Sequence, residues 1–481
     1  MHFNGEAIRS RIRISSRRQH WMLTGLMLQG TMDLLDVGMF NVAMPVIQQE
    51  FELTVEILSL VVAVRYLARI GMMPIYGLIG DRLGKKRSLL AGMITFFLGG
   101  MTCLISPSLT VLVIGRILLG IGGGILPLSM AIISDHFPTG QRGRILGIWN
   151  SASPVGSIIG PPLGGLVIEY FGWKAIFALV SLGSLTAITL VHRLVPGSER
   201  DQKSESPIDW FGATCLFTLA TGLLMATTTS SVFPFGSPAN LAFWLITVIA
   251  LVLMIWDGTK NPNALINAEI VKNVRLILPS IAMIFRMFAL TGTSFLLVLY
   301  FANVFDKSPS AIGLIMIFHS TSLFIGVPIG GMFADRWTCR KAASLGMIIQ
   351  AIGMIWLTSI HPQGNPFILI PGMILGGVGA GFSLTPFNKG AIASLGEVNT
   401  GRAAGLYNMV RFTGSASSSP ILGLILAAQF KQVGGVETVT TPYQFSFLIL
   451  MICALISAGF AALIPPPCDD SETEVSITEE I

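Results

Sequence analysis

Residues 77–82 read Gly-Leu-Ile-Gly-Asp-Arg, and residues 331–336 read Gly-Met-Phe-Ala-Asp-Arg. The aspartates of the two copies, Asp81 and Asp335, are 254 residues apart, and Lys or Arg residues follow both copies. Each copy lies between two long apolar runs. One such string is a weak signal, but its recurrence at the same place between apolar runs predicts a duplicated membrane protein.

The composition supports a membrane protein. The chain has 481 residues, of which 52% are hydrophobic and only 11% are charged. A soluble domain carries about 25% charged residues. This chain cannot cover a water-facing surface with so few charges, so we expect lipid to be most of its solvent. Its five cysteines show no metal-ligand or redox-motif spacing.

Fourteen apolar stretches are long enough to cross about 30 Å of hydrocarbon, which takes about 20 helical residues. The sequence therefore predicts an all-α integral membrane protein with fourteen transmembrane helices. The expected spans are 21–47, 57–79, 88–107, 109–133, 145–169, 173–195, 208–228, 239–256, 276–302, 309–333, 341–360, 366–393, 403–429 and 445–465.

The distribution of basic residues tests this count through the positive-inside rule. With the N-terminus inside, the inner segments hold 22 Lys and Arg residues and the outer loops hold three. Five arginines remain within the spans. This asymmetry favours an even number of spans with both termini in the cytoplasm. We expect the protein to lie in the plasma (inner) membrane of the cell.

Both copies of the opening segment then fall in inner loops, after the second and the tenth span. Gly147 and Gly156 in the fifth span have an echo in Gly405 and Gly414 of the thirteenth. We therefore expect two equivalent six-helix halves with two inserted helices between them, as duplicated halves are a common transporter plan. The expected divisions are a basic tail 1–20, a first half 21–195, an insertion 208–256, a second half 276–465 and an acidic tail 466–481.

These features resemble the major facilitator superfamily. The inner-loop motif of that family is matched over residues 77–87, and its fourth-span arginine motif is matched at Arg116. The resemblance implies two six-helix bundles and a role in coupling conformational change for the following motif residues: Gly77, Gly80, Asp81, Arg82, Gly84, Lys85, Lys86, Asp335 and Arg336.

Two further matches narrow the resemblance. The fifth span matches the "antiporter" motif that is typical of exporters, at Gly147, Gly156, Gly160, Pro161, Gly164 and Gly165. Residues 36–45 look like the first-span motif of fourteen-span drug:proton antiporters, the EmrB/QacA-like group. Generic helix packing through small residues is the plainer explanation of the glycines.

Only two carboxylates lie deep in the spans, Asp33 and Asp36, and their spacing places them on one helix face. Charges inside a bilayer are costly and usually functional. Arg116 is expected at about the depth of Asp36, and Arg65 at about the depth of Asp33. We predict acid–arginine pairs, with Asp36–Arg116 the favoured one, that couple transport to protons; a static ion pair that fixes helix packing is the alternative.

Arginines outnumber carboxylates within the spans. Arg65 and Arg69 share one face of the second span, while Arg286 and Arg411 lie in the ninth and thirteenth spans. If these side chains line the cavity, an anionic or zwitterionic substrate becomes more plausible than a lipophilic cation. Snorkelling or carbonyl contacts would explain them equally well. Asn41 and His319 are weaker cavity candidates, since each could simply bond a neighbouring helix.

Several functions are disfavoured. No phosphate-binding loop, metal-ligand cluster or nucleophile elbow is present in the sequence, so we expect no catalytic residues, no metal and no cofactor. The basic tail suits the cytoplasmic leaflet, and nothing indicates nucleic acid. The expected partners are lipid, protons and a small-molecule substrate; a monomer is one option for the working unit, and accessory efflux proteins stay open.

The leading hypothesis is a proton-coupled exporter of small organic or drug-like compounds that works by alternating access. A specific transporter of an anionic or zwitterionic metabolite, importing or exporting, is the alternative. A non-transporting membrane sensor or an intramembrane enzyme is a remote third.

Overall fold

The computed structural model describes residues 16–137, 139–196, 210–228, 237–261, 264, 274–359, 365–392, 400–432 and 440–465. All regular structure in these ranges is helical. Most of the expected basic tail and all of the acidic tail lie outside the described residues, and so do large parts of 196–207 and 257–275, which separate the expected divisions. The first helix, α1, already begins at Ser16.

In the part of the chain that the structure describes, the ranges expected to cross the membrane are mainly helical, but 109–133 is divided between two helices and 366–393 begins as a 3-10 helix. Within the described residues, eight spans are long and apolar enough to cross a membrane by length and composition alone. The helices are α1 (Ser16–Glu50), α2 (Val55–Leu83), α3 (Lys85–Leu104), α4 (Leu109–Gly123), α5 (Leu126–His136), α6 (Thr139–Phe171), α7 (Ala175–Leu194), α8 (Trp210–Thr228), α9 (Pro238–Lys260), α11 (Val274–Asn303), α12 (Pro309–Arg336), α13 (Cys339–Leu357), the 3-10 helix η2 (Pro366–Leu369), α14 (Ile370–Ile392), α15 (Thr400–Gln432) and α16 (Thr441–Ala462).

Polar caps begin several of these helices. The hydroxyls of Thr54, Ser108, Ser308 and Thr338 each accept a hydrogen bond from a backbone N–H in the first turn of α2, α4, α12 and α13. Such a cap satisfies one of the donors that a helix start leaves unpaired. Capping residues therefore help to set where these four helices begin, whereas the burial of apolar side chains drives the packing of the helices.

The fourth expected span, 109–133, is divided into two helices rather than one. α4 ends at Gly123, and α5 begins at Leu126 with a proline in its first turn. Proline lacks the N–H that would continue the ladder, and the preceding glycines are poor helix formers. The break lies close to the charged residues of α1.

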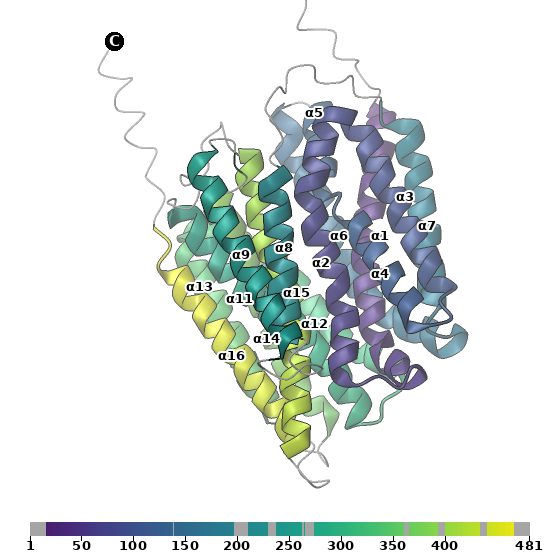
Figure 1. Ribbon diagram of the computed structural model, residues 1–481, viewed down its shortest axis with the longest axis vertical. Helices are drawn as coiled ribbons and strands as arrows, with labels where there is room; N and C mark the ends of the chain where they lie inside the picture. Colours follow the sequence, from purple (N-terminus) through teal and green to yellow (C-terminus); the bar gives the residue numbers. More distant parts are fainter. Residues whose placement is uncertain are drawn as a thin grey trace, which may run out of the picture.

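The two halves repeat one packing plan. In the first half α1 packs against α6 and α7, and α3 packs against α4 and α7. In the second half α11 packs against α15 and α16, and α13 packs against α14 and α16. The halves meet where α2 packs on α15 and α6 packs on α12, and α8 lies along the first of these two joints with α9 against it (Figure 1).

Glycines on α6 allow this helix to approach α1 closely. A methyl group added to Gly156 would lie 2.5 Å from the carbonyl oxygen of Thr31. One added to Gly160 would lie 3.0 Å from the Cα of Gly38, and one on Gly164 would lie 2.7 Å from the Cα of Met39. α6 runs unbroken through Pro161. Gly147 also lies in α6, but its surroundings are outside what the structure describes.

Candidate functional site

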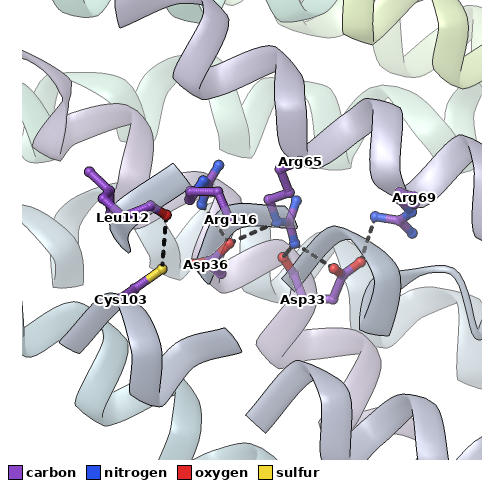
Figure 2. Close-up of polar contacts among 7 residues, drawn as sticks. All are labelled: Asp33, Asp36, Arg65, Arg69, Cys103, Leu112 and Arg116. Atoms are coloured by element: carbon purple, nitrogen blue, oxygen red, sulfur yellow. Dashed lines mark hydrogen bonds and ion pairs between the residues drawn. The ribbon is translucent and has the colours of Figure 1, made fainter. Parts of the chain in front are cut away.

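A buried cluster of five charged side chains occupies the middle of the first half. It contains Asp33 and Asp36 of α1, Arg65 and Arg69 of α2, and Arg116 of α4, and each is at most 7% exposed. Figure 2 shows the two carboxylates of α1 turned toward these arginines. We call this group the charge cluster.

Asp33 binds two arginines. Nη2 of Arg65 donates to its Oδ1 over 2.5 Å and to its backbone carbonyl oxygen over 3.0 Å. Nη1 of Arg69 donates to its Oδ2 over 2.7 Å. Arg65 and Arg69 are one helical turn apart, so they present two guanidinium groups to one carboxylate. The first of these pairs was predicted from the sequence, and the second was not.

Asp36 also faces two arginines. Nη1 of Arg116 donates to its Oδ2 over 3.1 Å, so the predicted Asp36–Arg116 pair is present. Nε of Arg65 lies 3.0 Å from the same oxygen. Arg65 thus bridges the two acids, and the pairs predicted separately form one network (Figure 2).

The electrostatics of the charge cluster leave it charged overall. Three guanidinium groups face two carboxylates, a formal excess of one positive charge. Burying ions is costly, and attraction offsets the desolvation only when the pairs are well formed. Removing one partner from such a network is strongly destabilising because it leaves another charge buried alone. Oδ1 of Asp36 has no hydrogen-bond partner among the described residues.

Aromatic rings complete the surroundings of two arginines. The guanidinium carbon of Arg116 lies 3.6 Å from the ring centre of Phe40, and that of Arg69 lies 4.5 Å from the ring centre of Phe412. Such contacts stabilise a cation most when water is excluded. Because Phe412 belongs to α15, Arg69 connects the charge cluster to the second half.

The second half contains a buried arginine of a different kind. Nε of Arg286 donates to Oγ of Ser383 over 2.9 Å and to the carbonyl oxygen of Ala380 over 3.1 Å, and Nη2 also donates to that carbonyl. Arg286 is 1% exposed, and within the described ranges no carboxylate pairs with it. The structure therefore does not bring Arg286 into the charge cluster.

The other cavity candidates are dispersed. Arg411 stacks on the ring of Phe412, 4.7 Å from its centre, and is close enough to Arg69 for their charges to interact. His319 of α12 is buried, with its Nδ1 3.1 Å from the carbonyl oxygen of Met373. Asn41 is partly buried on α1 and does not join the ion pairs. Arg411 therefore lies beside the charge cluster.

The duplicated inner-loop motif forms ion pairs within each half. Nζ of Lys85 donates to Asp135 over 2.7 Å, and Nζ of Lys86 donates to the carbonyl oxygen of His192 over 2.8 Å. In the second copy Lys389 pairs with Asp335, while Arg336 is exposed. The side chains of Asp81 and Arg82 lie outside the described residues, so their expected roles stay predictions.

The glycines of the first copy have different surroundings. Gly84 joins α2 directly to α3 with φ of 92° and ψ of 133°. Residues other than glycine rarely adopt this backbone conformation. A methyl group on Gly80 would overlap Leu128, whereas one on Gly77 would meet no atom within 4 Å.

Sequence reasoning missed a contact between the halves. Oε2 of Glu169, near the end of α6, accepts a hydrogen bond of 3.2 Å from the backbone N–H of Ser310 in the first turn of α12. A lone acid at the end of a span carries no motif, so nothing in the sequence signals this contact. A carboxylate at a helix start is a favourable arrangement, and here it crosses from one half to the other.

The chain has clear relatives among known transporters. The sequence profile described as Major Facilitator Superfamily matches residues 26–268 and 280–478. The chain is 24% identical over 380 residues to the riboflavin transporter RibZ of Clostridioides difficile (strain 630), covering 79% of this chain and 82% of that protein. It is 27% identical over 402 residues to the multidrug resistance protein Stp of Mycobacterium tuberculosis (strain CDC 1551 / Oshkosh), covering 82% of this chain and 74% of Stp.

A solved structure shares the fold. The xylose transporter XylE from E. coli, in a partially occluded inward-open conformation, superposes with a TM-score of 0.65 and 16% identity over 94% of this chain and 99% of that one. The profile match covers most of the sequence and both halves. This all-helical chain therefore belongs to the major facilitator superfamily and is a membrane transporter.

Proposed function

We propose that this transporter is a proton-coupled exporter of small organic or drug-like compounds. The observation that carries the proposal is the charge cluster, in which two buried carboxylates hold three arginines. Protonating Asp33 removes the ion pair of Arg69, and protonating Asp36 removes that of Arg116; neither arginine pairs with another carboxylate in the described part of the chain. A proton therefore changes which contacts are stable inside the protein, as coupling requires.

The surroundings of Asp33 connect such a change to the joint between the halves. Arg69 binds Asp33 over 2.7 Å on one side and stacks on Phe412 of α15 on the other. When Asp33 is neutral, Arg69 loses its ion pair and its contact with α15 changes. In an alternating-access cycle, protons from outside would protonate the acids and favour release of the exported compound there.

We further infer that the chain crosses the membrane fourteen times with both termini in the cytoplasm. The charge asymmetry of the loops supports this topology, since basic residues are retained inside. Reporter fusions test it: green fluorescent protein fused after residue 481 should fluoresce, and alkaline phosphatase fused after residue 235 should be active outside. Inactive phosphatase at that position would contradict the placement of α8 and α9.

Transport across proteoliposomes tests the coupling. With ethidium and fluorescein as probes, an imposed pH gradient should drive uptake of at least one of them against its concentration gradient. Asp36→Asn and Asp33→Asn should abolish the response to the gradient. Asp306→Asn is the matched control, because Asp306 is exposed and its φ of 48° suits asparagine. Probe movement that ignores the gradient, or a fully active Asp36→Asn variant, would rule the coupling out.

The second candidate is a transporter for an anionic or zwitterionic substrate. Arg286 is the observation in its favour, because its buried guanidinium donates to a carbonyl, a hydroxyl and two methionine sulfurs and has no carboxylate partner among the described residues. A substrate carboxylate or sulfonate could supply that charge. Under this candidate fluorescein, not ethidium, is transported, and Arg286→Gln and Arg411→Gln reduce its transport. Equal transport of both probes by these variants and by the parent would exclude it.

A further inference from the structure

A small cleft opens beside Asp33, on the side toward the start of α1. Its polar lining comes from Gln29 and Asp33 of α1, Arg69 of α2, Ser129 of α5 and Trp149 of α6. Its volume is about 20 Å³. A site of roughly 10–15 Å³ suffices for one water molecule, whereas organic ligands occupy sites of about 300 Å³ or more. The cleft therefore has the size of a water site.

Three hydrogen-bond donors at the cleft have no partner among the residues that the structure describes. They are Nε2 of Gln29, Nε1 of Trp149 and Nε of Arg69, and all three residues are at most 5% exposed. The amide of Gln29 is held in place because its Oε1 accepts a 3.0 Å hydrogen bond from Oγ of Ser184. A buried donor without a partner is energetically costly, so three of them around one space indicate an acceptor there.

The break between α4 and α5 forms one wall of the cleft. Gly123, Ile125 and Leu126, which flank the break, all line it. A methyl group on Gly123 would lie 2.9 Å from Oδ1 of Asp33, so glycine here allows the acid to approach the broken helix. Interrupted helices are where transporters commonly hold coupling ions.

We propose that this cleft holds a water molecule that passes protons between Asp33 and the membrane face at which α1 begins. The inference rests on the proposed proton coupling and adds the route that the proton takes. One lone pair of the water oxygen accepts from the amide of Gln29 or the indole of Trp149, and the other accepts from the hydroxyl of Ser129, which leaves a water hydrogen for Asp33. A hydroxyl both donates and accepts, so Ser129 is the group that can hand on a proton.

The transfer balances in each direction. When Asp33 is protonated, a water O–H bond breaks as the carboxyl O–H bond forms, and the water oxygen regains a proton from the hydroxyl of Ser129, which is reprotonated from solvent. Release reverses these steps. Gln29 lies four residues before Asp33, about 6 Å along α1, so the cleft extends toward the face on which α1 begins. The charged and titratable groups around Asp33 in the described structure are Asp36, Arg65, Tyr66 and Arg69.

The rate at which Asp33 takes up a proton tests the relay without a transport substrate. The full chain in lipid nanodiscs is subjected to a pH jump, and the carboxyl band that Asp33→Asn removes is followed by infrared spectroscopy. Gln29→Leu, Trp149→Phe and the milder Ser129→Ala should each slow this band by about fivefold to tenfold, as expected for one lost hydrogen bond, with its amplitude unchanged.

Two matched variants control for burial alone. Gln350→Leu removes another buried glutamine, in α13 of the second half, whose amide has no partner within the described ranges. Trp173→Phe removes an indole N–H that donates to Glu50 instead. Both should respond at the parent rate. If Ser129→Ala and the Gln29→Leu/Trp149→Phe double variant also respond at that rate, the relay is wrong while Asp33 still titrates. If the parent shows no Asp33 band, the relay and the proposed coupling through Asp33 both fall.

Discussion

The two halves share a helix arrangement but differ in what they bury. In the first half, Arg65 is held between two carboxylates of α1. In the second half, Arg286 is held by a carbonyl and a serine hydroxyl. His319 stands 254 residues after Arg65, the same offset as the duplicated motif, and its Nδ1 lies 3.1 Å from the carbonyl oxygen of Met373. Both halves share the packing plan, but among the described residues the buried ion pairs lie in the first half alone.

The largest effect should separate these two arginines. Arg65→Met should destabilise the protein by about 3–5 kcal/mol, because two acids stay buried with a partner missing. Arg286→Met should cost only about 1 kcal/mol, since it leaves no carboxylate behind. Denaturant-induced unfolding in detergent measures both, with the exposed Arg193→Met as control. Equal losses at Arg65 and Arg286 would break the comparison.

The helix contacts should respond alike in both halves. Gly156→Ala places a methyl group 2.5 Å from the carbonyl oxygen of Thr31, and Gly414→Ala meets the carbonyl of Ile284 in the same way. Each should lower stability by about 1–3 kcal/mol through overpacking. Thermal unfolding gives the measurement. Gly459→Ala, where no atom lies within 4 Å, should not destabilise, and a similar loss there would remove the argument from close packing.

The two copies of the opening motif should differ in their tolerance of a side chain. Gly84→Ala should cost about 1–2 kcal/mol because φ at this residue is 92°. Gly331→Ala in the second copy should be neutral or slightly stabilising, as Gly331 is helical and its nearest neighbour would be an ordinary 3.4 Å contact with Thr385. The same unfolding assay compares them, and a reversed order would show that backbone conformation at Gly84 is not what matters.

The smallest expected effect is at Thr338, which takes the place of Gly84 in the second copy. Its hydroxyl accepts from the backbone N–H of Lys341 and caps α13. Thr338→Ala should therefore cost about 1 kcal/mol, while Thr338→Ser keeps the acceptor and should cost less. Indistinguishable stabilities of the two variants, measured by the same unfolding transition, would mean that the cap contributes nothing.

Much of the helical plan could be predicted because apolar length and loop charge are properties of the sequence alone. The depth of Asp36 and Arg116 also follows from counting residues along their spans. What depth does not give is the direction in which a side chain points around its helix. Counting residues could not show that Arg65 bridges two acids instead of one. It also could not show that Arg286, which lies in a similarly apolar stretch of sequence, donates to a backbone carbonyl.

The cleft beside Asp33 could not be predicted for the same reason. Gln29, Ser129 and Trp149 come from three helices and share no motif. The helix break that helps to enclose them had a signal in Gly123, Gly124 and Pro127, but a hydropathy window reads through it as one span. Contacts that join distant segments through single polar atoms, such as Glu169 with Ser310, leave no periodic pattern.

The position of α8 has a consequence for how a compound dissolved in lipid could reach the interior. α8 packs against α2 and against α15, so it covers the joint between the halves on that flank. A molecule diffusing in the bilayer would meet α8 there instead of the joint between α2 and α15. Entry from the lipid would then be left to the opposite flank, where α6 meets α12. In this way α8 and α9 would block access to the interior from one side of the protein only.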